Sequence, residues 1–356
     1  MSVVLQHSLQ NYGTGDEIAG ALTQYGGSII KSYFDEMVAA KHVWKLPITG
    51  GSTFQFPGSA MATASDVDPG VDRTGANQPE MEFRTVALDL KEMESDRWES
   101  LTDDFIRHFD ITAAYGEAHG KALAYLEEDR LLRMISIGAR QASRPASGSP
   151  VADTFPAGTI VYSDTTTSTT VLTTNYPASL TGSLSLQNDL AKLAQAFDEK
   201  NCGKDGRVAF LSPAMHRVLR QDKTLVSRDY QGTNDMLTRS LLFVEGFAIE
   251  QTNRMPAGTE TSTANLALPS QYRVNNAADA TGGTSGGLHA SVTNYTTAVL
   301  AIAGKDAVGE ITALGGVRPV NPEWVTWKNA WFMGAKLWLG AKWIRPCACG
   351  EIALSG

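Results

Sequence analysis

The sequence predicts an α+β protein, and three features of the chain carry that prediction. Residues 50–90 have the alternating pattern of a long β-hairpin, with a connection rich in Gly, Pro, Asp and Ser. Residues 96–142 contain no proline and place apolar side chains every three or four positions, as one very long helix would. Residues 331–343 alternate in character with a period of two, which favours a strand. Such a hairpin and helix seldom bury their apolar surface within one chain, so the pattern favours packing against other subunits.

Composition limits the classes of protein that fit. The chain has 356 residues, enough for one large or two ordinary domains, and its 42% hydrophobic content supports a real core. Charged residues make up 19%, below the ~25% typical of soluble domains, which indicates surface that becomes covered. The net charge is −8 and no run of Lys or Arg occurs, so sequence-specific DNA binding is not expected. An acidic protein can still enclose DNA, because weak repulsion keeps the polymer off the wall.

The cysteines and the N-terminal region bear on the compartment. Cys202, Cys347 and Cys349 are a sparse, odd set, which argues against a secreted disulfide framework and fits a reducing cytosol. Residues 1–20 lack a basic region followed by an apolar one, so we expect no signal peptide. No stretch of ~18 uninterrupted apolar residues occurs. We therefore expect a soluble protein made inside the cell.

The first elements are a helix and a hairpin. Apolar positions recur at helical spacing over residues 16–42, and Gly26-Gly27 weakens the middle, which predicts a kinked or two-piece helix. Residues 53–56 and 81–90 alternate as paired strands. The connection between them is longer than compact domains normally tolerate, so it is either disordered or ordered by a neighbouring subunit.

The long helix comes next. If unbroken, residues 96–142 would span roughly 60–70 Å at 1.5 Å per residue. Gly116 and Gly120 either bend this helix or let another backbone approach it closely. Thr102, followed by two aspartates, is an alternative start for it.

The second half alternates between helices, strands and loops. Residues 143–183 have a connector composition with one hairpin, 159–162 paired with 169–173. Ser212-Pro213 is a helix N-cap followed by a first-turn proline. The further expected elements are a helix over 186–197, a strand over 208–211, a strand pair broken at Gly246 over 241–252, a long loop over 256–290, and strands over 297–303, 311–319, 324–327 and 331–343.

The order of these parts resembles a known family. The residues that carry the resemblance are short motifs in a fixed order: Gly27-Ser28-Ile29-Ile30, Phe54-Gln55-Phe56-Pro57, Pro69-Gly70-Val71-Asp72, Phe210-Leu211-Ser212-Pro213, Gly246-Phe247-Ala248-Ile249, Asn253-Arg254-Met255-Pro256 and Gly340-Ala341-Lys342-Trp343-Ile344-Arg345-Pro346. Together they resemble the major capsid protein of tailed phages, the HK-ninety-seven fold, and within it the short-tailed, T-seven-type phages.

The resemblance implies an architecture: an N-terminal arm (1–49), an extended β-hairpin loop (50–95), a long spine helix with the first part of a peripheral β-sheet domain (96–185), an inserted α/β axial domain (186–308) and the C-terminal strands of the peripheral domain (309–356). It also implies pentamers and hexamers that close into an icosahedral shell around double-stranded DNA. Scaffolding and portal proteins would be partners during assembly in the host cytoplasm, and the virion would be the final location.

Four side chains are our candidates for contacts between subunits: Trp44, Phe54, Phe56 and Arg73. Ordinary local packing or solvent exposure is the alternative for each. We expect no catalytic, cofactor or metal site. His108 with Asp110 and His119 with Glu117 are two positions apart on the predicted helix, a spacing that directs side chains to different faces, so ordinary helix surface is expected there.

Two further sets of residues could form a metal site. Cys347 and Cys349 would share one side of a strand, but no nearby Cys or His completes a tetrahedral metal site. Asp66, Asp68 and Asp72 lack the pattern of a calcium loop and read as an exposed acidic loop. The rival functions are an encapsulin-type compartment that encloses cargo enzyme, and a metal-dependent enzyme that uses the two cysteines.

Overall fold

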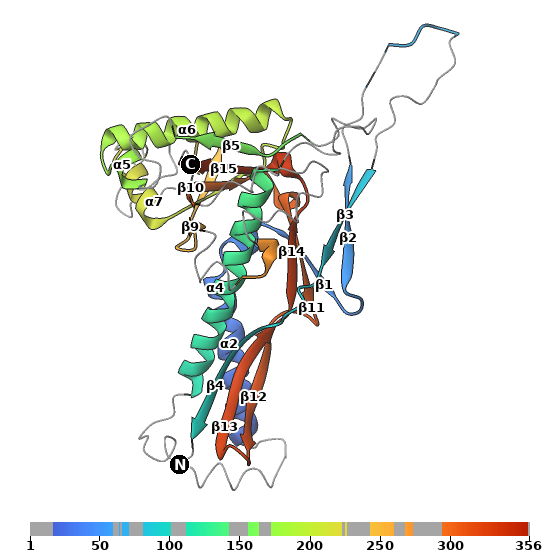
Figure 1. Cartoon of the computed structure of the whole chain (residues 1–356), viewed down its shortest axis with the longest axis vertical. Helices are drawn as coiled ribbons and strands as arrows, with labels where there is room; N and C mark the ends of the chain where they lie inside the picture. Colours follow the sequence, from blue (N-terminus) through green and yellow to red (C-terminus); the bar gives the residue numbers. More distant parts are fainter. Residues whose placement is uncertain are drawn as a thin grey trace.

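The computed structural model describes residues 17–59, 64, 66–70, 81–100, 112–141, 156–163, 172–222, 225, 243–259, 268–272 and 294–354. Its long axis follows helix α4 (Thr112–Ala139), which runs from a three-stranded sheet at one end to a seven-stranded sheet at the other (Figure 1). A two-stranded hairpin stands to one side of this axis. The molecule is therefore elongated, and much of its surface lies far from its core.

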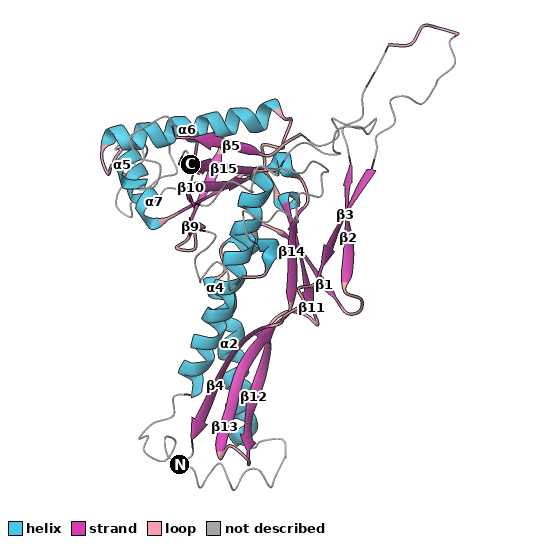
Figure 2. Cartoon of the chain, in the orientation of Figure 1, coloured by secondary structure: helices cyan, strands magenta, loops and turns pink. Residues whose placement is uncertain are grey.

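Helix α2 (Glu17–Glu36) packs along α4, as the ribbon in Figure 2 shows. Of the kinked or two-piece helix predicted at Gly26-Gly27, the two-piece alternative is wrong, because α2 is one continuous helix. A Cβ atom at Gly26 would lie 3.5 Å from the ring of Pro319, an ordinary van der Waals contact, so α2 lies close to the neighbouring sheet here. The other helices are α5 (Leu172–Asn175), α6 (Leu180–Glu199) and α7 (Pro213–Leu219), with 3-10 turns η1 (Ala39–Lys41), η2 (Ser270–Tyr272), η4 (Lys305–Ala307) and η5 (Pro346–Ala348).

Four sheets are formed by the strands of the described residues. Their orders are β1-β11-β14, β12-β13-β4, the hairpin β2-β3, and the seven-stranded β5-β15-β10-β6-β8-β7 with β9 added on β10. The strands are β1 (Trp44–Ile48), β2 (Thr53–Ser59), β3 (Met81–Ala87), β4 (Met93–Ser100), β5 (Thr159–Tyr162), β6 (Val208–Leu211), β7 (Phe243–Val244), β8 (Phe247–Gln251), β9 (Ala257–Thr259), β10 (Asn294–Ile302), β11 (Val308–Ala313), β12 (Arg318–Val325), β13 (Ala330–Leu337), β14 (Leu339–Trp343) and β15 (Cys349–Ala353).

The predicted helix over 96–142 is wrong in its first part. Residues up to Ser100 belong to β4, which pairs antiparallel with β13 and places Trp98 opposite Phe332. Helix α4 has 28 residues and is about 42 Å long, shorter than the expected span. Local helical spacing was overridden here because a partner strand from the far end of the chain supplies the backbone hydrogen bonds. The alternative start at Thr102, and His108 with Asp110, lie outside the described residues.

The C-terminal strand prediction is correct in type but not in number. Residues 330–343 form two strands, β13 and β14, and the chain passes from one three-stranded sheet to another at Trp338. The indole Nε1 of Trp338 donates to the main-chain oxygen of Asp89, 2.6 Å away. This bond fixes the point at which the two sheets meet.

The seven-stranded sheet lies between two helices. Gly350 of β15 faces Leu193 and Phe197 of α6, while the next residue, Glu351, meets Arg140 of α4. The helix over 186–197, the strand over 208–211, the capped α7 and the strand pair around Gly246 are confirmed, and Ser212 Oγ accepts from the Met215 amide. The sheet also takes β5 and β15 from outside residues 186–308.

The hairpin predicted over 159–162 and 169–173 is wrong where the structure describes it. Strand β5 pairs parallel with β15, with Thr159 opposite Gly350, and residues from Leu172 form α5, while 169–171 lie outside the described residues. The sequence lacks a nearby sign of this pairing, because the partner strand is nearly two hundred residues away in a chain of 356. Most of the expected loop over 256–290 lies outside the described residues.

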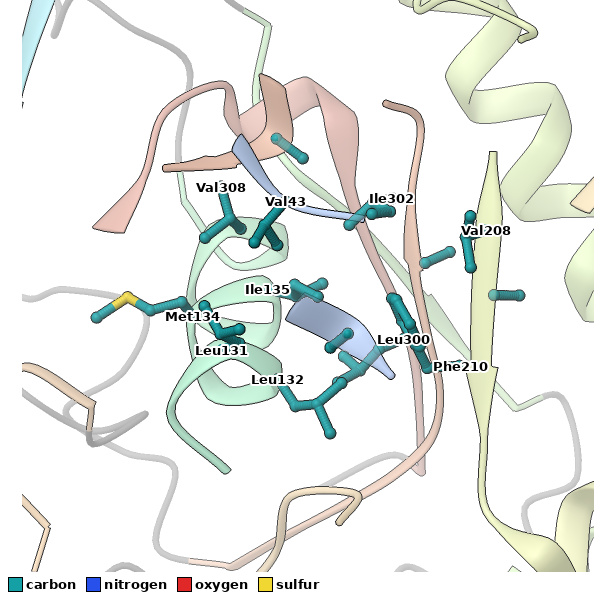
Figure 3. Packing of buried hydrophobic residues seen from close by; sticks show 14 of the residues in the cluster. Val43, Leu131, Leu132, Met134, Ile135, Val208, Phe210, Leu300, Ile302 and Val308 are labelled. Atoms are coloured by element: carbon teal, nitrogen blue, oxygen red, sulfur yellow. The ribbon is translucent and has the colours of Figure 1, made fainter. Parts of the chain in front are cut away.

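The main core fills the junction of α4 with the seven-stranded sheet. Figure 3 shows Leu132 and Ile135 of α4 on the side toward Leu300 of β10 and Phe210 of β6, whereas Met134 points to the other side of the helix. All of these side chains are almost completely buried, and burial of each large one contributes roughly 1.5–3 kcal/mol. The labelled members are Val43, Leu131, Leu132, Met134, Ile135, Val208, Phe210, Leu300, Ile302 and Val308.

Candidate intersubunit surfaces

The hairpin β2-β3 is fixed to the rest of the chain by one face only. Phe56 and Val86 are fully buried in a small cluster with Ile311 and Ile344. On the same face, the Arg84 guanidinium stacks on the ring of Trp343, 3.7 Å from its centroid. Alternation then directs the other set of side chains outward. The root of the hairpin is therefore part of the subunit's own core.

The outward face of the hairpin carries Phe83. This side chain is 57% exposed although it lies on the strand next to the buried Arg84. Its neighbours on this face, Gln55 and Thr85, are uncharged and exposed. A large aromatic group on a thin two-stranded element has no core of its own to enter. It is the strongest candidate on the hairpin for contact with another subunit.

A second exposed apolar surface lies on the sheet β12-β13-β4. We call Trp98, Trp327, Lys328 and Phe332 the aromatic patch. The rings of Trp98 and Phe332 are 4.7 Å apart, those of Trp98 and Trp327 are 6.4 Å apart, and Lys328 Nζ lies 3.6 Å from the Trp98 ring. Trp327 is 79% exposed. This face of the sheet points away from α2 and α4.

A groove of about 490 Å³ extends the same face. Its lining includes Arg318, Val320 and Lys336, whose positions in the register of β12 and β13 are on the side of Phe332. Lys336 pairs with Glu94 of β4 at 3.3 Å. The face therefore combines exposed rings, a hollow and surface charges, the usual composition of a protein interface.

Buried charges connect α4 to the segments around it. Glu128 accepts main-chain N–H groups of Val38 and Ala39 at 2.6 and 2.7 Å, which caps η1. Arg140 forms a bidentate pair with Glu351, at 2.8 and 2.9 Å. Each such pair sets one element on α4 in a single position, since an unpaired buried charge is costly.

Asp89, just after the hairpin, is another of these anchors. Its carboxylate is paired with Arg130 of α4 and accepts from the Tyr272 hydroxyl at 3.0 Å. Burial raises the pKa of Asp89 to about 6, although Arg130 and the hydrogen bond from Tyr272 act in the opposite direction. The path of the chain out of the hairpin is thus held by α4 and η2.

The comparisons with known proteins can now be set beside this geometry. The sequence matches no protein-family model, and it matches no curated protein. Among solved structures, the capsid of Cyanophage P-SCSP1u has a TM-score of 0.68 and 20% identity, with 88% of this chain and 86% of that chain covered. The mature capsid of bacteriophage PhiM1 has a TM-score of 0.62 and 15% identity, covering 90% and 87%. The capsid of Ralstonia phage GP4 has a TM-score of 0.54 and 15% identity, covering 90% and 92%.

This chain has the phage capsid fold. The resemblance predicted from the order of the motifs is confirmed at this level, and so is the mixed α+β class. The hairpin over 53–56 and 81–90, the helix α2 and the strands at the C-terminal end are parts of this fold in the structure.

Within the phage capsid fold, the predicted contact residues have different surroundings. Phe56 is 0% exposed, with the rings of Trp44 and Phe54 at 5.0 and 5.1 Å, so it has no surface to offer a neighbour. Trp44 and Phe54 are half-buried at the edge of the same cluster, and their contact with another subunit stays a prediction. Arg73 lies outside the described residues. The alternation of the sequence could have identified Phe83, because it lies one residue before the buried Arg84 on β3 and its side chain therefore points to the other face of the hairpin.

The residues considered above for catalysis or metal binding can also be placed in the structure. The expectation of ordinary helix surface at His119 is wrong: the side chain is buried, Nδ1 lies 2.8 Å from Ser95 Oγ on β4, and burial lowers the pKa of its imidazole. Asp66 and Asp68 are exposed. Across the residues that the structure describes, no three His, Cys, Asp or Glu side chains are grouped as metal ligands. In the same part of the chain, no helix has the length and hydropathy needed to cross a membrane.

Proposed function

We propose that this chain is the major capsid protein of a tailed phage and has a structural, non-catalytic role. Copies of it assemble through pentamers and hexamers into an icosahedral shell around double-stranded DNA. The observation that carries the proposal is the likeness to two phage capsids, with TM-scores of 0.68 and 0.62 over about nine tenths of the chain. Finite shells need closed symmetry, and many modest contacts per subunit add up to a stable particle.

The surfaces of the subunit support self-association. Phe83 on the hairpin β2-β3 and Trp327 at the turn between β12 and β13 are exposed rings on two separate parts of the subunit. Such groups lower solubility unless a partner covers them. The net charge of −8 is suitable for a wall that surrounds DNA without binding it tightly.

The finer assignments belong to the same proposal. In the HK-ninety-seven scheme, α2 is in the N-terminal arm, β2-β3 in the extended loop, α4 is the spine helix, β12-β13-β4 the peripheral sheet, and the seven-stranded sheet the axial domain. We place the protein nearest the short-tailed, T-seven-type phages on the motifs of its sequence. Scaffolding and portal proteins are its partners during assembly in the host cytoplasm, and the virion is its final location.

Particle formation tests the proposal. The full-length chain is expressed alone and with a candidate scaffold from its own genome, and the product is sized by light scattering and imaged by negative-stain microscopy. We expect closed particles, and in infected cells the particles protect DNA from nuclease. A discrete small oligomer under all conditions would contradict a capsid role.

The same experiment distinguishes the rival functions. Small shells that contain protein cargo and no DNA would indicate an encapsulin-type compartment, which the structural likenesses with TM-scores above 0.6 do not favour because both are phage capsids. A metal-dependent enzyme would purify with a stoichiometric metal ion and as a small oligomer. Metal analysis of the particles therefore completes the test.

A variant locates the contact on the hairpin. Phe83→Ser removes the exposed ring, so we expect a lower particle yield with an unchanged melting temperature of the unassembled subunit. Thr85→Ser is the matched control, because Thr85 is on the same face of the same strand and loses little apolar surface. Equal yields from both variants would exclude Phe83 from the interface.

A further inference from the structure

Two cysteines from distant parts of the chain meet in the interior. Cys202 follows the C-terminal end of α6, and Cys347 lies in η5, just before β15. Their separation along the chain is 145 residues, yet Cys202 Sγ lies 3.2 Å from the main-chain oxygen of Cys347. Each of the two side chains also shifts the pKa of the other. Both side chains are buried and both are free.

The electrostatic surroundings make the two thiols unequal. The neighbouring Cys202 side chain and the Arg345 guanidinium together lower the pKa of Cys347 to about 7. The interaction with Cys347, together with burial, raises the pKa of Cys202. Cys347 is therefore the group that holds the negative charge near neutral pH, and Cys202 keeps its proton.

Basic side chains on two elements face this pair. Arg345 is paired with Asp306 of η4, and Lys200 donates to the main-chain oxygens of Ala157 and Gly158 at 2.8 and 2.9 Å. Both cations contribute to the field at Cys347. They are held by other partners, so the charge around the pair is built into the fold.

Cys349 takes no part in the pair. Its thiol is directed toward the main-chain oxygens of Arg345 and Ala307, at 3.6 and 3.8 Å, and it is fully buried. Burial raises the pKa of Cys349, so it stays protonated. Cys349 is thus separate from the pair formed by Cys202 and Cys347, whereas the sequence analysis considered Cys347 together with Cys349, as two thiolates for a metal.

We propose that Cys202 and Cys347 are a modification site, at which hydrogen peroxide forms an intramolecular disulfide. The Cys347 thiolate attacks the peroxide O–O bond, which gives a sulfenic acid and releases hydroxide. The Cys202 sulfur then displaces the hydroxyl group from Cys347, the S–S bond forms and water leaves. Two thiols lose two electrons, and the peroxide is reduced to two waters once a proton neutralises the hydroxide.

The crosslink would join α6 to the segment that carries β15. Because β15 lies between β5 and β10 in the seven-stranded sheet, the bond would hold one covering helix to the middle of that sheet. A protein made in a reducing cytosol and later released would gain this bond only outside the cell. The inference goes beyond the proposed function and holds whether or not the chain forms shells.

Peptide mapping tests the disulfide directly. The native full-length protein is treated with hydrogen peroxide at neutral pH, its remaining thiols are alkylated in denaturant, and tryptic peptides are analysed by mass spectrometry. We expect residues 201–204 linked to the peptide that begins at Trp343 and contains Cys347. The free thiol count falls from three per chain to one, and dithiothreitol restores it.

Variants make the outcome decisive. Cys349→Ser keeps the linked peptide and a peroxide-induced rise in melting temperature, whereas Cys347→Ser and Cys202→Ser lose both. The rate of crosslinking rises several-fold between pH 6 and pH 8, as the thiolate of Cys347 forms. A link between Cys347 and Cys349, sulfinic acid at Cys347 without a link, or three unreacted thiols would each overturn the proposal.

Discussion

A Cβ atom at position 120 would overlap the carbonyl oxygen of Ile29, which belongs to the neighbouring helix α2. One turn earlier, a Cβ atom at Gly116 would lie 3.1 Å from the carbonyl oxygen of Tyr25. The two glycines therefore let the backbones of α2 and α4 touch along one turn. The sequence left open whether these glycines bend the helix or allow another backbone to approach it. The structure shows the close approach.

This contact predicts the effect of one methyl group. Gly120→Ala should lower the free energy of unfolding of the unassembled subunit by about 1–3 kcal/mol, since main-chain atoms of α2 must move. Gly27→Ala is the control: Gly27 is exposed on α2 with nothing within 4 Å, so the change should stabilise by about 0.5–1 kcal/mol. Urea denaturation measures both. If both alanines stabilise, the backbones are not in contact.

At the scale of elements, four segments meet at one buried acidic site. Glu127 of α4 accepts from the Tyr33 hydroxyl of α2, and Lys45 Nζ of β1 lies 2.5 Å from Glu127 and 3.4 Å from Glu310 of β11. Both carboxylates are 0% exposed, and neither oxygen of Glu310 has a hydrogen-bond partner among the residues that the structure describes. One lysine cannot neutralise two carboxylates. Burial and the negative charge of Glu127 accordingly raise the pKa of Glu310 well above its usual value.

The sign of the pH effect follows from this direction. A carboxyl group with a raised pKa in the folded state binds its proton more tightly there than in the unfolded chain. Its stabilising effect is full below the ordinary pKa of 4.5 and is lost as the pH rises through the raised value. Within that window, wild type should lose up to about 1.4 kcal/mol of unfolding free energy per pH unit more than Glu310→Gln.

Urea denaturation of the unassembled subunit across pH 4–9 measures the difference. Asp89 gives a slope of the same sign in both proteins and cancels in the comparison. Lys45 keeps its proton across this pH range in wild type, because Glu127 and Glu310 raise its pKa from 10.5. Glu117→Gln, at an exposed position of α4, should run parallel to wild type. Parallel curves for wild type and Glu310→Gln would mean that Glu310 is ionised in the fold.

Elements whose signal lies within their own sequence were predictable, and elements that depend on a distant partner strand were not. The capped helix α7 and the turn at Gly246 carry their signals within a few residues, and both were found. Strand β4 has no such signal, since its sequence is also compatible with a helix. Its strand conformation depends on pairing with β13, which lies more than two hundred residues later in the sequence. His119 was misread for the same reason, because the Ser95 that contacts it lies on β4.

For the whole molecule, the limit of prediction concerned which side of an element faces inward. Phe54 and Phe56 were correctly placed on one side of a strand, but that side turned out to pack on Ile311, more than two hundred residues later in the sequence. The outward residue, Phe83, was recognisable only after the inward face was known. A contact surface between subunits is what remains after the internal packing has been assigned.

The last prediction concerns the part of the hairpin beyond its paired strands. The register of β2 and β3 ends where Ser59 faces Met81, and the buried cluster extends from Phe56, in the middle of the paired strands, toward the other end. Deleting residues 60–78 would leave residues 79 and 80 to connect the strands, a common hairpin length. We expect the variant to fold, with a melting temperature close to that of wild type, and to form distorted shells or none.

A variant of the hairpin root separates assembly from folding. Phe56→Ala should cost about 3–5 kcal/mol of folding stability, because it removes a fully buried ring, so it loses assembly together with the fold. The deletion should lose assembly alone, as judged by thermal melting beside light scattering and electron microscopy. Normal shells from the deletion variant would show that the segment is dispensable. The contacts that close the shell would then lie elsewhere, with the aromatic patch as the next surface to mutate.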